Sequence, residues 1–211
     1  GFMLKTKLLN FLLVFMLLTG VFSGCSSETP ETQDIYEVLF GEIRIGLSDV
    51  RLGDLSFGTS QEDVFSAEGL NESDVQIRDI EDIGSRFVVV QEKYIYDELD
   101  PYGTQKTFTF VDDGLSGIAY SVAYRDVPHE DAYASAMGVY EKLDGILEST
   151  EAEFEESGSI DSLDQVGGYF TKQWTLGGTN ISLNMNYQDM SGVDFTDMDQ
   201  FNLSINFTPA K

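Results

Sequence analysis

The chain contains little cysteine and little histidine. Among its 211 residues there is one of each, Cys25 and His129. A lone cysteine excludes a disulfide within the chain, and one Cys with one His leaves too few ligands for the usual zinc sites. A Ser-His-Asp site would need His129, yet the sequence has no G-x-S-x-G motif to present a serine. We therefore expect His129 to be a surface residue in the first turn of a helix, and we predict no catalytic or metal-binding residue.

Basic residues are also scarce, since 12 Lys and Arg stand against 37 Asp and Glu. Lys5 and Lys7 precede Cys25 and no acid does, so 10 basic and 37 acidic residues remain from Cys25 onward. Such a negative field repels phosphate backbones, which argues against a nucleic-acid partner. With so many acids, carboxylate pairs arise by chance, and no pair stands out as the two carboxylates of a glycoside hydrolase. The composition thus predicts a protein that is not an enzyme and needs no cofactor.

No apolar run at the N-terminus is long enough to cross a membrane, which takes roughly 20 residues. Residues 1–24 instead combine the two early lysines with a short apolar core, FLLVFMLL at 11–18. A basic start followed by a short apolar core is the pattern of a signal peptide. The sequence therefore predicts export from the cytoplasm.

The stretch FSGC, residues 22–25, resembles the lipobox of bacterial lipoproteins, with small residues at Ser23 and Gly24. The resemblance implies cleavage just before Cys25, whose sulfur then carries a diacylglycerol with fatty acyl chains such as palmitate. The polar residues 26–34 that follow would form a tether, which reaches at most about 30 Å when extended. The resemblance thus implies an extracytoplasmic lipoprotein of the cell envelope, anchored by its lipid to a bacterial membrane.

Apolar and polar residues alternate with a period of two in several stretches, as they do in half-buried strands. Asp113-Gly114 and the sequence GGTN at 177–180 provide turn residues typical of tight hairpins. One-sided alternation favours an antiparallel sheet with one face against a core. The four alternating stretches and two more heavily apolar ones predict strands at 118–124, 170–176, 181–187 and 203–207, and at 86–96 and 106–111.

Aromatic side chains share the phase of the aliphatic ones in these stretches. Tyr120, Tyr124 and Tyr187 fall in phase with the aliphatic residues of their strands, and Trp174 does so in its own. We therefore expect these four side chains to face the core. An exposed patch of Tyr and Trp would instead indicate capture of a glycan or a peptide.

Two helices are predicted. Apolar residues at three- and four-residue steps indicate one from about Pro128 to Ser149, with Pro128 in the first helical position. A shorter helix is expected within residues 57–70, where Thr59 and Glu62 have the spacing of a capping box and Gly69 suits the C-terminal end. The apolar face of the longer helix is expected to consist of Tyr133, Met137, Tyr140, Leu143 and Leu147.

The predicted fold class is α+β, with an antiparallel meander sheet packed against helices. Residues 35–211 are expected to form a single domain, with halves at about 50–125 and 126–211. Each half contains a helix followed by three strands, which suggests a two-fold helix-plus-three-strand pseudo-repeat. The segment 148–165 is charge-rich and shows no core-forming pattern, so it is expected to be a loop.

The stretch LGDLSFGTSQEDVFSAEG, residues 52–69, resembles the opening of domains in the group of the β-lactamase inhibitor protein and the SmpA/OmlA (BamE) lipoproteins. Residues 108–120 are similar to the aromatic strand, turn and strand of that group, and 174–187 resemble a related pattern in uncharacterised secreted bacterial proteins. The resemblance implies an α+β domain that acts by protein–protein interaction and not by catalysis. The positions that match in the opening stretch are Gly58, Thr59, Glu62, Asp63 and Val64.

Four aspartates lie within DMSGVDFTDMD at 189–199, namely Asp189, Asp194, Asp197 and Asp199. Calcium prefers such oxygen ligands, but the spacing does not match the EF-hand loop, and a polar loop between two strands is the favoured explanation.

The leading functional hypothesis is a lipid-anchored, non-enzymatic protein-interaction module whose partner is another envelope protein. The alternative is a surface lipoprotein that binds a small ligand or a glycan. A tyrosine-lined pocket with convergent polar groups would favour the alternative.

Overall fold

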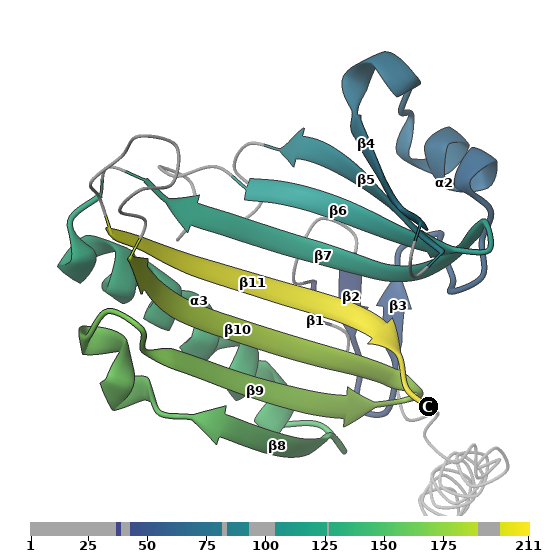
Figure 1. Cartoon of the computed structure of the whole chain (residues 1–211). Coiled ribbons are helices and arrows are strands. Elements are labelled where there is room, and N and C mark those ends of the chain that lie inside the picture. Colours follow the sequence, from purple (N-terminus) through teal and green to yellow (C-terminus); the bar gives the residue numbers. More distant parts are fainter. Residues whose placement is uncertain (1–36, 39–42, 82–83, 93–103, 126, 190–198) are drawn as a thin grey trace, which may run out of the picture. The chain divides into compact units, whose positions relative to one another are not determined.

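A computed structural model describes residues 37–38, 43–81, 84–92, 104–125, 127–189 and 199–211 (Figure 1). The chain from Ile35 to Lys211 forms one compact unit. Within the described residues, no helix is both long and apolar enough to cross a membrane. The unit combines helices with a large antiparallel sheet, so the α+β prediction is confirmed.

Eight strands form the large sheet, in the order β4-β5-β6-β7-β11-β10-β9-β8, and all neighbours are antiparallel. Two runs of four consecutive strands meet where β7 pairs with β11. The strands are β4 (Gln76–Ile80), β5 (Ser85–Glu92), β6 (Thr104–Val111), β7 (Gly114–Tyr124), β8 (Glu153–Gly158), β9 (Tyr169–Leu176), β10 (Thr179–Asp189) and β11 (Asp199–Pro209).

Each run therefore has four strands and not the predicted three. The two strands absent from the prediction are β4 and β8. The expected loop at 148–165 is wrong, since it contains β8 and the 3-10 helix η4 (Ile160–Asp164). Every residue of β8 is exposed, so neither face of the strand requires apolar side chains. Its sequence EFEESG accordingly shows no alternation of apolar and polar residues. Leu163 in η4 is completely buried, a single apolar anchor that periodicity could not reveal.

A second sheet of three short strands was also not predicted. It consists of β1 (Glu37–Val38), β2 (Ile43–Ile45) and β3 (Val50–Leu52), paired in that order. Ile43, Ile45 and Leu52 are buried and belong to the same hydrophobic core as the large sheet. Strands this short give too few positions for an alternating pattern to be recognised.

Helix α3 runs from His129 to Glu148, with Pro128 and Ser149 as the flanking caps. Pro128 is thus the N-cap and not the first helical residue that the sequence predicted. Tyr133, Met137 and Tyr140 are only partly buried at the margin of the core. Small residues allow the helix to approach the sheet closely, and the fully buried stripe is Ala132, Ala136, Val139, Leu143 and Leu147.

The shorter helix α2 (Gln61–Glu68) begins one residue later than the predicted capping box implied. Ser60 is the N-cap, and its hydroxyl accepts the backbone N–H of Asp63 at 3.2 Å. Thr59 instead accepts the backbone N–H of Ser56 at 3.3 Å. The predicted end at Gly69 is confirmed, with a left-handed φ of 65°. A 3-10 turn, η1 (Glu72–Asp74), then leads into β4.

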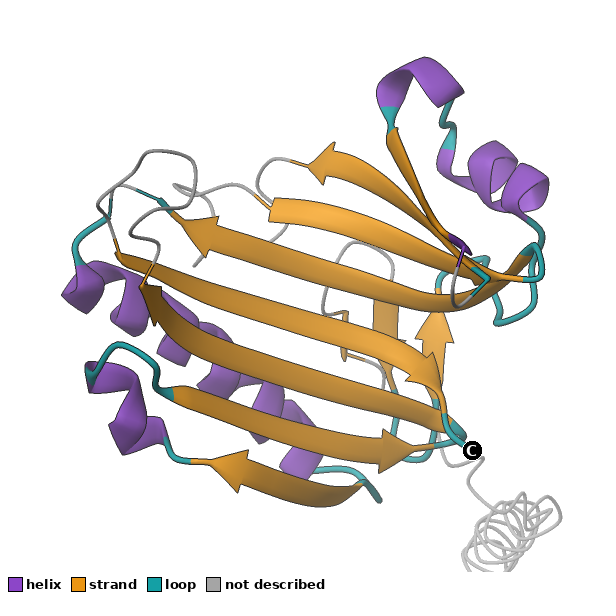
Figure 2. Ribbon diagram, in the orientation of Figure 1, coloured by secondary structure: helices purple, strands orange, loops and turns teal. Residues whose placement is uncertain are grey.

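Helix α3 and the three-stranded sheet lie on one side of the large sheet (Figures 1 and 2). That side carries the core, which includes Trp174, Tyr124 and Phe108, each at most 2% exposed. The predicted inward positions of Trp174, Tyr120 and Tyr124 are therefore confirmed. Among the described elements, no helix or strand lies over the opposite face of the central strands (Figure 1).

The hairpin between β6 and β7 is confirmed, but its two loop residues are Asp112 and Asp113 and not Asp113-Gly114. Both have positive φ angles, 50° and 65°, as a type I′ turn requires. This conformation is unfavourable for residues with a Cβ and suits glycine. Asp113 thus occupies the place that glycine holds in the favoured Asn-Gly turn.

Replacing Asp113 by glycine is expected to raise the free energy of unfolding by about 0.5–1 kcal/mol, because it relieves the left-handed conformation. Urea unfolding measures the change. Asp54→Gly removes the same charge at an exposed position without a positive φ, so it should not stabilise the protein. Equal stabilisation by both variants would attribute the gain to lost charge and contradict the turn explanation.

Candidate functional site

The uncovered side of the central strands carries no charged residue. Along β6, β7, β11, β10 and β9, every second side chain faces the core, and the residues between them face the other way. We call this uncovered surface the neutral face. Its side chains are those of Gln105, Thr107, Thr109, Val111, Ala119, Ser121, Ala123, Tyr169, Thr171, Gln173, Thr175, Asn180, Ser182, Asn184, Asn186, Gln188, Gln200, Asn202, Ser204, Asn206 and Thr208.

Strand register arranges these side chains in rows across the sheet. One row joins Thr171, Asn184, Ser204, Ser121 and Gln105, which are successive partners from β9 to β6. Within it, the Thr171 hydroxyl donates to Asn184 Oδ1 at 3.0 Å, and Asn184 Nδ2 donates to Ser204 Oγ at 3.5 Å. The Asn184 side chain is thereby held between its two neighbouring strands.

Other rows show the same lateral bonding. Asn202 Nδ2 donates to Asn186 Oδ1 at 3.0 Å, and the Thr175 hydroxyl donates to Asn180 Oδ1 at 2.9 Å. An asparagine amide has two N–H donors and an oxygen with two acceptor sites. One lateral bond therefore fixes the orientation of each amide and leaves further hydrogen-bonding capacity for a bound partner.

Charged residues reappear only where the neutral face ends. At the β8 edge, Glu153 and Glu155 pair with Thr175 and Gln173 of the neutral face and so share its side. At the opposite edge, Arg78 of β4 pairs with Phe87 of β5, which itself pairs with Thr109. The neutral face is therefore a bounded surface, framed by charge at both sheet edges.

Beneath β9, on the helix side, a buried ion-pair cluster supports the sheet. The Lys172 side chain is 6% exposed, and its ammonium lies 2.7 Å from Asp144 of α3 and 3.0 Å from Glu156 of β8. Burial alone would lower the pKa of Lys172, but hydrogen bonds to these two carboxylates raise it above its ordinary value. The cluster ties α3 and the β8 edge to β9, whose opposite side contributes to the neutral face.

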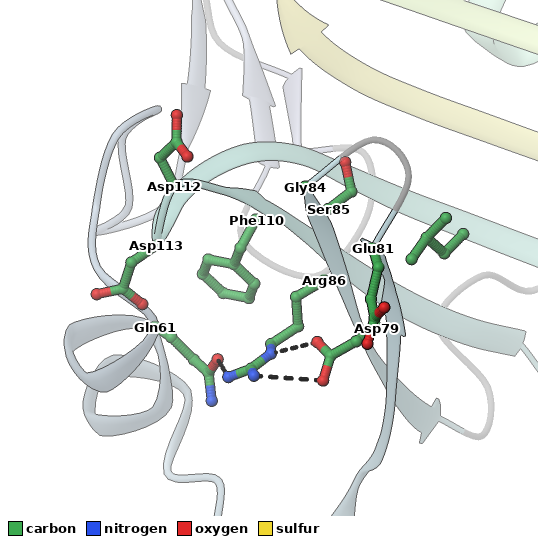
Figure 3. A pocket seen from close by; sticks show the side chains of 10 residues that line it. Gln61, Asp79, Glu81, Gly84, Ser85, Arg86, Phe110, Asp112 and Asp113 are labelled. Atoms are coloured by element: carbon green, nitrogen blue, oxygen red, sulfur yellow. Dashed lines mark hydrogen bonds and ion pairs between the residues drawn. The ribbon is translucent and has the colours of Figure 1, made fainter.

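A cavity of about 340 Å³ opens near the N-terminal end of α2 and the β6–β7 hairpin (Figure 3). The Arg86 guanidinium donates to Asp79 at 2.7 and 3.3 Å and to Gln61 Oε1 at 3.0 Å. The bond from Arg86 holds the pKa of the Asp79 carboxyl below its usual range. Phe110 is also part of the lining.

The electrostatics of this cavity disfavour an anionic ligand. Besides Asp79, its lining includes Glu81, Asp112 and Asp113, against the single guanidinium of Arg86. Asp79 already engages that guanidinium through two hydrogen bonds. The remaining carboxylates leave an excess of negative charge, so a phosphate or carboxylate group would be repelled.

The surface position expected for His129 is wrong. The ring is half-buried, Nε2 lies 2.8 Å from the Leu163 carbonyl oxygen, and the Tyr187 ring centroid is 4.4 Å away. Tyr187 itself is only partly buried, and it packs against the core beside His129. His129 thus links the start of α3 to η4 and to the end of β10.

Two groups of predicted site residues lie wholly or partly outside the described residues. Cys25, the predicted lipidation site, is one. Of the four aspartates considered for calcium, Asp194 and Asp197 also lie outside. Asp189 and Asp199 are register partners at the ends of β10 and β11. In the described part of the chain, no three His, Cys, Asp or Glu side chains gather closely enough to hold a metal.

The neutral face was not recognised from sequence, although its signal is visible there. The outward positions of NISLNMN and FNLSINF are all Asn or Ser, in a chain otherwise rich in acids. Comparisons with protein-family models, with curated proteins and with solved structures gave no significant match to this chain. The site must therefore be interpreted from its own chemistry.

Proposed function

We propose that this chain is a lipid-anchored, non-enzymatic interaction module of a bacterial cell envelope that binds an envelope protein through the neutral face. One observation carries the proposal: a broad sheet face without charge, uncovered by any described element, in a chain with 37 acidic residues. Depletion of charged residues at the centre of a surface is one part of the compositional signal of protein interfaces.

The residue types of the neutral face suit contact with another protein. Asn and Ser supply adaptable hydrogen bonds in binding surfaces, and Ala119 and Ala123 have no long side chain to displace. The lateral bonds at Asn184 and Asn202 restrict side-chain rotation before binding. Less conformational entropy is then lost when the partner docks, which favours affinity.

The membrane anchor and the internal repeat belong to the same proposal. Lipid at Cys25 would hold the module near the membrane, where its partner resides. The order helix, four strands, helix, four strands supports a two-fold repeat in which α2 and α3 open equivalent halves. The joined last strands of the two runs, β7 and β11, would then place the centre of the neutral face at the repeat axis.

The glycan or small-ligand alternative has less support. The Arg86 cavity has no tyrosine in its lining, and neither does a cavity of about 320 Å³ bounded by β3 and the Gly177–Gly178 turn. Only Tyr169, at one end of the neutral face, offers an exposed aromatic ring there. Stacking on aromatic rings is therefore restricted to one margin of the surface.

Crosslinking and capture of the full-length protein from its native envelope tests the proposal. Ser204→Glu places a charge in the central row of the neutral face, and we expect it to reduce capture of the protein partner at least about tenfold, because like charges or an unpaired buried charge then oppose docking. Ser66→Glu on exposed α2 is the matched control and should capture normally. Cys25→Ala should release the protein from the membrane fraction.

Two results would count against the proposal. If Ser204→Glu captures the same proteins as the unaltered chain, the neutral face is not the binding surface. If a glycan copurifies in place of any protein, the alternative function replaces this one. Circular dichroism of both glutamate variants establishes that they remain folded.

A further inference from the structure

We infer that the occupant of the neutral face is a second copy of this chain, so that two molecules pack sheet to sheet around a two-fold axis. The inference rests on the proposed function and specifies its partner.

The hydrogen-bonding chemistry of the neutral face is self-complementary. In a two-fold interface the same patch faces itself, so a residue near the axis meets its own copy. A carboxylate or an ammonium at such a place repels its copy, whereas an amide or a hydroxyl both donates and accepts. Asn184, Ser204 and Ser121 occupy the central row of the neutral face, and all three side chains have this dual character.

The overall charge of the chain also selects this face. Two copies with 37 acids each repel one another wherever their charged surfaces approach. Exposed acids occupy α3, with Glu130, Asp131 and Glu141 among them, and also the β8 edge. On the neutral face, two copies can meet with carboxylates only at its β8 border.

The dimensions of the neutral face fit a modest dimer. Five strands about 4.8 Å apart, with three to five outward positions along each and about 6.7 Å between positions, give a projected area of roughly 650 Å². Two copies would bury about 1,300 Å² in total, within the roughly 1,200–2,000 Å² of specific interfaces. Confinement to one membrane raises the local concentration, which favours an interface of this size.

Light scattering of the full chain, purified in mild detergent, measures the protein mass of the particle. We expect a concentration-dependent dimer that strengthens when salt rises from about 0.05 to 0.5 M, because salt screens the repulsion between acids. Ser204→Glu and Ser204→Lys should each weaken dimerisation at least about tenfold. An equimolar mixture of these two variants should restore it, since opposite charges then face each other.

Restoration in the mixture requires that the neutral face meets itself, because a dimer formed elsewhere would not respond to it. A monomer at all concentrations overturns the inference, as do dimers that both Ser204 variants leave intact. Ser66→Glu, the exposed control on α2, should dimerise as the unaltered chain does. If the chain is monomeric but Ser204→Glu still loses an envelope partner in the capture experiment, the proposed function stands and only the second copy is excluded.

Discussion

Replacing Lys172 by alanine is expected to lower the free energy of unfolding by about 3–5 kcal/mol, the usual cost of breaking a buried ion pair. The ammonium lies within 3.0 Å of both Asp144 and Glu156. Asp144 is 17% exposed and would be left as a buried carboxylate without its counter-ion. Glu156 is 44% exposed and can turn toward water, so the penalty falls mainly on Asp144.

A second variant separates the lost charge from the lost packing. The Lys172 ammonium also lies 4.4 Å from the Phe154 ring centroid and 5.4 Å from that of Trp174, so its side chain fills space among aromatic rings. Lys172→Met with Asp144→Leu removes both charges and fills the site with apolar side chains, and it should recover most of the stability. If this double variant is as unstable as Lys172→Ala, the uncompensated carboxylate is not the cause.

The stability also depends on pH through this lysine. Since the pKa of Lys172 is raised in the folded state above its ordinary value of 10.5, the stabilisation is fully present below pH 10.5. It is lost as the pH rises through the folded-state value. Urea unfolding at increasing alkaline pH should therefore show the unaltered chain and Lys172→Met converging in stability.

Substituting Gly177 by alanine is expected to destabilise the protein by about 2–4 kcal/mol, from two effects that add. Gly177 has a φ of 54°, and alanine in that region costs about 1 kcal/mol. A Cβ there would also lie 2.4 Å from the Ser48 carbonyl oxygen and 2.6 Å from the Asp49 Cα. These are backbone atoms of the β2–β3 turn, so the turn itself must move, at about 1–3 kcal/mol.

Gly178 is the matched control for this prediction. It lies in the same hairpin loop with a φ of 79°, but a Cβ there meets nothing within 4 Å. Gly178→Ala should therefore show the conformational cost alone, about 1 kcal/mol. Thermal unfolding compares the two, and an equal loss in both variants would contradict the close approach of the β2–β3 turn to the β9–β10 hairpin.

Much of the sheet could be predicted because its central strands alternate strictly. Trp174 and Tyr124 share a phase with their aliphatic neighbours, and that phase alone places them in the core. Strand β8 could not be found this way, because it is an exposed edge strand whose Phe154 is 60% exposed. Edge strands carry charged side chains for protection from aggregation, and these erase the alternation.

The extent of the neutral face across five strands could not be predicted, because it depends on strand order. Gln105 and Thr171 lie in one row only because β7 pairs with β11, which joins the two ends of the domain. Local patterns do not specify such a pairing between strands distant in the chain. The start of α2 could be predicted only to within one residue. Thr59 and Ser60 are adjacent hydroxyl residues, and the sequence alone does not specify which of them is the N-cap.

The most direct test of the central claim is the capture experiment with Ser204→Glu beside Ser66→Glu in the full-length chain. Both variants add one carboxylate to the same protein, and only the first adds it to the neutral face. The binding role of the neutral face predicts that Ser204→Glu loses its crosslinked protein partner and Ser66→Glu keeps it. Equal capture by the two variants would contradict that role.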